Sequence, residues 1–293
     1  ASGTILLALA APKIKALGDK YGFINLSEYF GLKWGQKNRI FAAVIIFLTF
    51  FALLALQFIA TGSIVSPLLN ISYPTVVIVS GAIVLAYLLL GGYKAVVATD
   101  LLQAILMFFI FASLVIFLNV NEINFVNPIS SIAINPALFI AFFLIGVFVI
   151  FSSADIWQRI YSAKTASVAR KSLFTSTILW LIFGFFITLV GVAAKINFPN
   201  IDPNEAFYWG LFGTLPQWLL GFGVVMVLAT IMSTIDTEVY LLSSIIAKDF
   251  VASRKKNIDD IQLTKIIKIG MAALSILAML FAIIVRDVLV VLF

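Results

Sequence analysis

Residues 217–250, QWLLGFGVVMVLATIMSTIDTEVYLLSSIIAKDF, form an apolar segment long enough to span a membrane, and its second half carries hydroxyls and carboxylates. The polar positions fall on one helical face, because they recur at intervals of three, four and seven. They are Thr230, Ser233, Asp236, Thr237, Tyr240 and Ser244. From Asp236 to Lys248 a helix rises about 18 Å, about half of a ~30 Å hydrocarbon core. The sequence therefore predicts a polar stripe that reaches the middle of a bilayer.

Asp236 is the costly member of this stripe. A carboxylate at the bilayer centre costs about 2.5–3.5 kcal/mol, so we expect it to face a cation, a polar partner or water. Hydroxyls also cross-link membrane helices for about 0.6 kcal/mol each, and we assign that role to Ser243 and Ser244. The polar cluster at mid-depth instead predicts a binding site. It consists of Ser233, Thr234, Asp236 and Thr237.

The composition is that of a polytopic membrane protein. Hydrophobic residues make up 63% and charged residues 11% of the chain, against about 45–50% and 25% in soluble domains. Cysteine and histidine are absent, so a bound metal must use oxygen ligands. The chain has a net charge of +6, but its basic residues border apolar segments and form no patch interleaved with aromatic residues. We therefore expect no nucleic-acid partner. No catalytic constellation or phosphate-binding loop occurs, so we expect neither an enzyme nor a cofactor.

Apolar segments of about 20 residues each are long enough to span a bilayer. We predict spans at about 38–67, 72–90, 92–119, 134–153, 170–194, 216–248 and 261–285, with partial spans at 1–12 and 288–293. We treat residues 1–293 as one transmembrane domain. Because both ends lie within apolar runs, we expect a piece of a longer protein. Residues 22–36 predict a short amphipathic helix at the membrane interface.

The basic residues predict the orientation of these spans. When the spans alternate in direction, all but Lys195 and Arg286 of the 19 lysines and arginines fall on one side. The positive-inside rule makes that side cytoplasmic. The chain is thus predicted to be a multi-pass protein of the cell membrane. Its predicted cytoplasmic loops are 13–37, 91–94, 154–171 and 249–262.

A second polar stretch, LLLGGYKAVVATDLLQ at 88–103, places Asp100 at a depth similar to that of Asp236. Its glycine pair, Gly91 and Gly92, permits a tight reversal between two spans. Two buried carboxylates repel each other unless they are protonated or bridged by a cation. A sodium ion held by carboxylate, hydroxyl and backbone oxygens satisfies both carboxylates. Proton binding by the same pair is the alternative.

Four motifs together resemble the sodium:solute symporter family, which includes sodium-coupled sugar, proline, pantothenate and sialic acid carriers. They are LSEYF at 26–30, GGYKAVVATDLLQ at 91–103, ADIWQRIYSAK at 154–164 and MSTIDTEVYLLSSIIAKDF at 232–250. Ser27 stands where the family usually has proline. The resemblance implies an all-α, leucine-transporter-like fold of two inverted five-helix repeats. Of these, this sequence would hold core helices 2 to 9 and would lack core helix 1.

The resemblance also implies ion ligands. By position, Ser233, Thr234 and the carbonyl of Thr230 match the principal sodium site of the family. A second sodium site, found in some members, matches another set. It comprises Asp100, Ser233, Asp236 and Thr237. Many members have a small or hydroxyl residue in place of Asp236, which leaves the stoichiometry and the choice between sodium and protons open.

Substrate contacts are predicted at Gln57, Gly146 and Ser153. The segment 134–153 corresponds to the broken core helix 6, with the break expected near Gly146. The alternatives are that Gln57 bonds to a neighbouring helix and that Ser153 caps the end of its own helix.

Asp155, Arg159 and Asp249 are candidates for a cytoplasmic gate. The alternative for Asp155 and Arg159, which are four residues apart, is an exposed ion pair along one helix.

The function predicted from these observations is sodium-coupled symport of a small polar solute, such as an amino acid, sugar, carboxylate or urea-like molecule, by alternating access. Two alternatives remain. One is a proton-coupled carrier, and the other is a transporter-like sensor module of a signalling protein.

Overall fold

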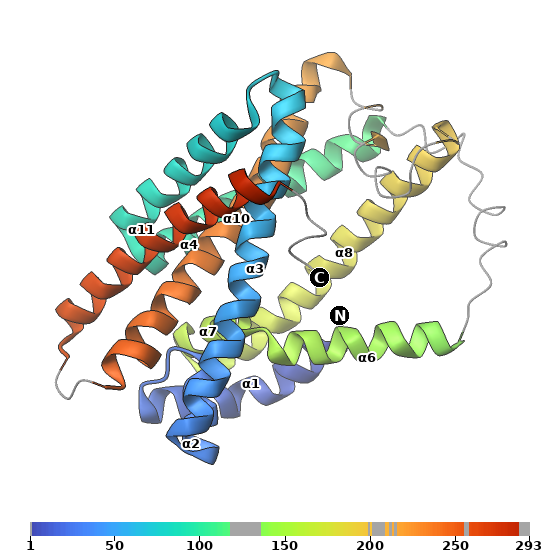
Figure 1. Cartoon of the computed structure of the whole chain (residues 1–293). Coiled ribbons are helices and arrows are strands. Elements are labelled where there is room, and N and C mark those ends of the chain that lie inside the picture. Colours follow the sequence, from blue (N-terminus) through green and yellow to red (C-terminus); the bar gives the residue numbers. More distant parts are fainter. Residues whose placement is uncertain are drawn as a thin grey trace. The chain divides into compact units, whose positions relative to one another are not determined.

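The computed structural model describes residues 2–117, 136–198, 200, 209–210, 213, 216–254 and 258–286. Within these ranges the regular structure is helical, with no strand (Figure 1). The longer helices are α1 (Ser2–Tyr21), α3 (Gln36–Leu69), α4 (Tyr73–Phe117), α6 (Pro136–Ser152), α8 (Ala166–Asn197), α10 (Gln217–Ile245) and α11 (Asp260–Val285). Two short helices, α2 (Leu26–Trp34) and α7 (Ala154–Ser162), and a π-helical turn, η3 (Ile246–Ala252), complete them. The predicted partial span 288–293 lies outside the described residues.

Five of the described helices are long and apolar enough to cross a membrane. They are α3, α4, α8, α10 with its continuation η3, and α11. A sixth results if α6 and α7, which are interrupted at Ser153, count as one broken span. Two of the spans predicted from the sequence, 72–90 and 92–119, overlap the single element α4, whose regular helix is broken at Gly92.

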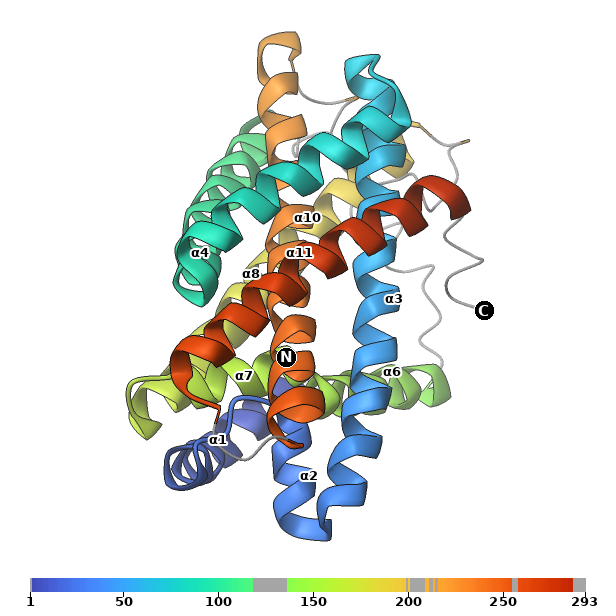
Figure 2. The same cartoon turned by 60° about the vertical axis from the view of Figure 1, so that its left-hand side comes forward.

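Gly92 has φ 53° and ψ −141°, a conformation that residues with a Cβ rarely adopt. The hydroxyls of Tyr87 and Thr99 both reach the same oxygen of Asp236. In a straight helix these two residues would lie about 18 Å apart along the axis. The chain therefore folds back at Gly92, as the glycine pair predicts, and Figure 2 shows this turn in α4.

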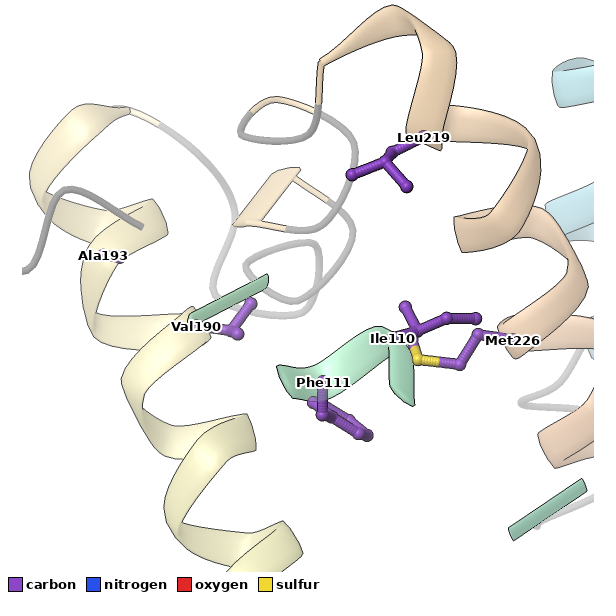
Figure 3. Close-up of a cluster of buried hydrophobic side chains, with 6 residues drawn as sticks. All are labelled: Ile110, Phe111, Val190, Ala193, Leu219 and Met226. Carbon is purple, nitrogen blue, oxygen red and sulfur yellow. The ribbon is translucent and has the colours of Figure 1, made fainter. Parts of the chain in front are cut away.

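The described chain divides into two compact units. The first contains Ala1–Lys13, Ile105–Ser153 and Lys164–Val227. Its core joins the end of α4 to α8 and the start of α10 (Figure 3), through Ile110, Phe111, Val190, Ala193, Leu219 and Met226. In the same unit α1 meets α6 closely, since a Cβ on Gly3 would lie 2.6 Å from the carbonyl oxygen of Gly146.

The second unit contains Ile14–Ala104, Ala154–Ala163 and Leu228–Phe293. The fully buried side chains of α3, α4 and α10 form its apolar core, including Leu54, Phe58, Leu88, Ile235 and Leu242. In this unit α2 folds back along the first turns of α3 (Figure 2), with Gly31 packed against Arg39. The buried carboxylates Asp236, Glu238 and Asp249 also lie in this unit. The candidate ion chemistry therefore belongs to the second unit.

The first predicted loop begins as helix. The sequence predicted a loop from residue 13, whereas α1 continues to Tyr21. Lys15 explains the difference, because its buried ammonium donates to Asp19 at 2.6 Å and to the carbonyl oxygen of Tyr161 at 2.9 Å. Because these two acceptors compensate its charge, Lys15 can be buried within a helix and does not mark the end of the helix.

Candidate ion-binding site

Three of the predicted sodium ligands lie within one turn of α10. The hydroxyls of Ser233 and Thr234 donate to the carbonyl oxygen of Thr230 at 2.8 and 3.4 Å. Both hydroxyl residues are half-buried and Thr230 is exposed. Three oxygens are thereby gathered on one side of α10, because serine and threonine in a helix readily bond back to the preceding turn.

Asp236 lies one turn further along and is 0% exposed. Its Oδ2 accepts hydrogen bonds from the hydroxyls of Tyr87 at 2.8 Å and Thr99 at 3.1 Å, and its Oδ1 accepts one from Thr237 at 3.4 Å. No described basic side chain forms a salt bridge with it. A buried carboxylate that neutral donors contact and no positive charge pairs with lacks compensation for its charge, and a cation binds favourably under that condition.

Asp100, the second predicted carboxylate, is paired with Arg159 of α7. The Nη2 of Arg159 donates to Asp100 Oδ2 at 2.8 Å and to the hydroxyl oxygen of Thr237 at 2.9 Å. The guanidinium thus connects the two carboxylate-bearing helices. Two acceptors remain, because Asp100 Oδ1 and Gln103 Oε1 are buried and have no hydrogen-bond partner among the described residues.

The predicted pairing of Asp155 with Arg159 is wrong. The salt bridge of Arg159 is with Asp100, and Asp155 forms none with any described residue. Spacing of four residues makes a helical pair possible but contributes only about 0.3–0.5 kcal/mol when it is exposed. The contact with Asp100 and Thr237 places the guanidinium on a partly buried carboxylate instead, where the attraction is stronger.

The carboxylate of Asp249 is buried and pairs with Arg39 of α3. Its carboxylate is 0% exposed and accepts hydrogen bonds from Arg39 Nε at 2.7 Å, Ser27 Oγ at 2.6 Å and Asn25 Nδ2 at 3.1 Å. The salt bridge of Asp249 is thus with Arg39 and not with the other gate candidate Arg159, because α2 and the start of α3 supply a complete set of donors. The gate role of these residues stays a prediction.

Glu28 completes this arrangement. Its Oε1 lies 3.3 Å from Arg39 and 3.7 Å from Lys248. Its Oε2 accepts the backbone N–H groups of Ile24 and Asn25, so it also caps the start of α2. We refer to the group that joins α2, α3 and η3 as the Asp249 cluster. It consists of Asn25, Ser27, Glu28, Arg39 and Asp249.

Gln158, next to Arg159 on α7, contacts the Asp249 cluster. Its Nε2 donates to Ser244 at 3.1 Å and to Asn25 Oδ1 at 3.5 Å. The Ser244 hydroxyl donates to the same Asn25 oxygen at 2.7 Å. The helix-linking role predicted for Ser244 is confirmed. The hydroxyl of Ser243 instead bonds, among the described residues, to the carbonyl of Tyr240 in its own helix. Two consecutive residues of α7 thus make different contacts. Gln158 bonds to the Asp249 cluster, and Arg159 bonds to Asp100 and Thr237 of the candidate ion site.

The predicted substrate residues are less well placed. The break expected near Gly146 is wrong, because α6 continues through Ser152 and is interrupted at Ser153. The hydroxyl of Ser153 donates to the carbonyl of Val149 at 2.7 Å, which is the capping alternative. Gln57 is half-buried in α3, in the other compact unit. A substrate role for these three residues stays a prediction.

Reasoning from the sequence missed Tyr87 and Thr99. A signal for them exists, because they lie at similar distances on either side of Gly92, and a reversal at that glycine brings such positions to the same depth. Polar residues at similar distances on either side of a glycine reversal can therefore both donate to one side chain of a third helix, as Tyr87 and Thr99 do to Asp236.

The sequence model of the sodium:solute symporter family matches residues 2–293. The chain belongs to this family. Among its relatives, the sodium/pantothenate symporter of Haemophilus influenzae is 24% identical over 284 residues, covering 86% of this chain and 58% of the relative. The high-affinity proline transporter PutP of Bacillus subtilis is 24% identical, with coverage of 93% and 62%. The sodium/proline symporter of Staphylococcus aureus is 26% identical, with coverage of 83% and 51%.

The chain thus spans about half to three fifths of the length of these relatives. A solved structure, the substrate-bound outward-open state of a Na⁺-coupled sialic acid symporter, superposes with a TM-score of 0.80 at 19% identity. The superposition covers 96% of this chain and 67% of that one. The predicted all-α, leucine-transporter-like fold is confirmed. The relatives are named as transporters, which agrees with the prediction that the chain is not an enzyme.

The donor set fits a hard monovalent cation. Carboxylate, hydroxyl, carbonyl and amide oxygens are the ligands that such ions prefer. Two of these oxygens, Asp100 Oδ1 and Gln103 Oε1, are buried acceptors without a described partner, and a cation would satisfy them. The residues present are therefore suited to sodium.

Proposed function

We propose that this protein couples the movement of sodium to the transport of a small polar solute by alternating access. The observation that carries the proposal is Asp236, a fully buried carboxylate in a membrane-spanning helix that forms no salt bridge with a described basic side chain and whose described side-chain partners are hydroxyls. Such a group is expensive in a bilayer unless an ion compensates it. Family membership supports the same reading, because the relatives are named for sodium-coupled transport.

Two overlapping sets of oxygens would hold sodium. Ser233, Thr234 and the carbonyl of Thr230 form the principal set. The second set shares Ser233 with the first and adds Asp100, Asp236 and Thr237. A bound sodium ion supplies the positive charge that the carboxylates lack. Because a ligand shifts a conformational equilibrium by its differential affinity, sodium favours the conformation in which these oxygens converge.

The relatives suggest a narrower class of solute. They and the structural neighbour are named for pantothenate, proline and sialic acid. All three molecules bear a carboxylate. We therefore propose that the transported solute is a small molecule of the predicted polar class that bears a carboxylate. We also propose that the lipid bilayer contacts the apolar faces of the helices.

The Asp249 cluster would act as a latch at one end of the transport path. It joins α2 and α3 to η3 through a fully buried carboxylate. Its arginine, Arg39, and the neighbouring Lys248 lie on the side that the charge distribution predicts to be cytoplasmic. A π-helical turn such as η3 often marks a functional position in a helix, which suits a segment that changes shape. We place the protein in the cell membrane with loops 13–37, 91–94, 154–171 and 249–262 in the cytoplasm.

Reconstituted vesicles test the proposal. Uptake of labelled proline, pantothenate and sialic acid is measured with an inward gradient of sodium, potassium or choline at constant ionic strength. Uptake of at least one solute should require sodium, and Ser233→Ala should weaken that requirement. Ser243→Ala is the matched control, because its hydroxyl bonds within its own helix. Uptake that follows pH and ignores sodium would instead support a proton-coupled carrier.

A further inference from the structure

Arg159 lies on the oxygens of the second cation set. Its Nη2 contacts Asp100 Oδ2 at 2.8 Å and Thr237 Oγ1 at 2.9 Å, and both residues are among the four predicted ligands. The guanidinium is always charged, because arginine does not lose its proton in proteins. A positive charge from the chain itself therefore already contacts this donor set.

Sodium and Arg159 would compete for the same atoms. An ion bound to Asp100 Oδ2 and the Thr237 hydroxyl needs the lone pairs to which Arg159 now donates. Two positive charges about 4 Å apart also repel each other strongly enough to weaken binding by about tenfold or more. Simultaneous occupation of these oxygens is thus unfavourable.

The surroundings allow the exchange. The Arg159 side chain is 42% exposed, whereas that of Asp100 is 18% exposed, so the guanidinium has a route to water that the carboxylate lacks. Asp100 Oδ1 and Gln103 Oε1 are buried acceptors still without a described partner. An incoming ion therefore gains oxygens that the guanidinium leaves unused.

We propose that Arg159 is a tethered cation that holds the second site in the absence of sodium and that sodium displaces from Asp100 and Thr237. The proposal rests on the proposed function, because it takes these residues as sodium ligands. Arg159 is a positioning residue in this account. It keeps the carboxylate compensated between ions and sets the sodium concentration at which the site fills.

The test is a sodium titration of melting temperature in purified protein, at constant ionic strength with choline as the replacement. All proteins carry Thr234→Ala, which removes a ligand of the principal set only, so that the titration reports the second. On this background Arg159→Gln removes the competing charge, and Arg159→Lys is the matched control that keeps it. The sodium concentration at half-maximal stabilisation should fall about tenfold with glutamine, equivalent to about 1.4 kcal/mol. With lysine it should change by no more than about threefold.

A half-saturating concentration that stays the same or rises in Arg159→Gln overturns the proposal. If sodium stabilises the unsubstituted protein but the glutamine variant behaves in this way, only the role of Arg159 fails. If sodium stabilises none of the proteins, the proposed function fails as well.

A second measurement needs no substitution at Arg159. Phenylglyoxal modifies accessible arginines, and mass spectrometry reports the rate at each site in the unsubstituted protein. Sodium, but not potassium, should raise the rate at Arg159 by severalfold, because displacement exposes the guanidinium. Arg170, which is exposed on α8, serves as the internal reference and should not change. A rate at Arg159 that sodium lowers or leaves unchanged contradicts displacement.

Discussion

Asp236 and Asp249 are two fully buried carboxylates on one continuous stretch of helix, and their surroundings differ. Asp249 faces a guanidinium, an amide and a hydroxyl. The side chains that bond to Asp236 in the described part of the chain are those of Tyr87, Thr99 and Thr237, and all three are uncharged hydroxyls. Burial alone therefore does not mark a site, because a carboxylate with a complete set of charged and polar donors is already compensated. The carboxylate without a charged partner is the one at which an ion gains most.

The largest effect should come from Asp249→Asn. Removing Asp249 leaves Arg39 with only the longer contact to Glu28, at 3.3 Å, and breaking a buried ion pair typically costs about 3–5 kcal/mol. The variant should unfold at a much lower temperature in detergent, with or without sodium. The double variant Asp249→Asn/Arg39→Gln should lose less than the sum of the single losses, because neither charge remains unpaired. An Asp249→Asn protein as stable as the parent would show that the cluster contributes little.

Ser233→Ala should act only through sodium. At 100 times its dissociation constant, an ion stabilises the folded state by about 2.7 kcal/mol, and the variant should lose most of that increment. Its melting temperature in choline should be unchanged, because the bond that its hydroxyl forms in the described structure is to the Thr230 carbonyl of its own helix. Ser243→Ala, whose hydroxyl has the same kind of local bond, should keep the full sodium increment. Equal sodium responses in the two variants would remove Ser233 from the site.

Tyr87→Phe should have a smaller effect, because it removes one donor to Asp236. A single hydrogen bond contributes about 0.5–1.5 kcal/mol, and bonds to charged groups contribute somewhat more. Tyr93→Phe is the control, since its hydroxyl contacts the exposed Ser162. Denaturant titration should show a clear loss for Tyr87→Phe and almost none for Tyr93→Phe. Similar losses would mean that the contact with Asp236 is not special.

The smallest effect on basal stability should be that of Asp236→Asn. The amide keeps an acceptor for Tyr87 and Thr99 and removes an uncompensated charge, so stability in choline should change by less than about 1 kcal/mol. The loss of stability in Asp236→Asn would then be much smaller than that in Asp249→Asn. A loss as large as that of Asp249→Asn would show that the two carboxylates have the same structural role.

Much of the fold was predictable because local patterns determine it. Apolar length predicts the membrane helices, intervals of three and four predict the stripe on α10, and the glycine pair predicts the reversal at Gly92. The break in the α6 segment was misplaced, because a membrane helix tolerates a glycine such as Gly146 when its backbone hydrogen bonds are kept.

The pairing of charges was not predictable from local spacing. Arg39 and Asp249 are separated by 210 positions, and Arg159 meets Asp100 across 59 positions. Sequence spacing favoured Asp155 as the partner of Arg159, because spacing predicts contacts between residues of the same helix and not contacts between helices. Which charge meets which is decided when helices pack, and that information enters only with the tertiary structure.

The most direct test of the central claim is thermal unfolding of the purified protein and of Asp236→Asn, with sodium exchanged for potassium or choline at constant ionic strength. Sodium alone should raise the melting temperature of the parent, and Asp236→Asn should lose at least part of this rise while keeping its stability in choline. Equal melting temperatures of the parent in all three cations would contradict sodium binding at Asp236.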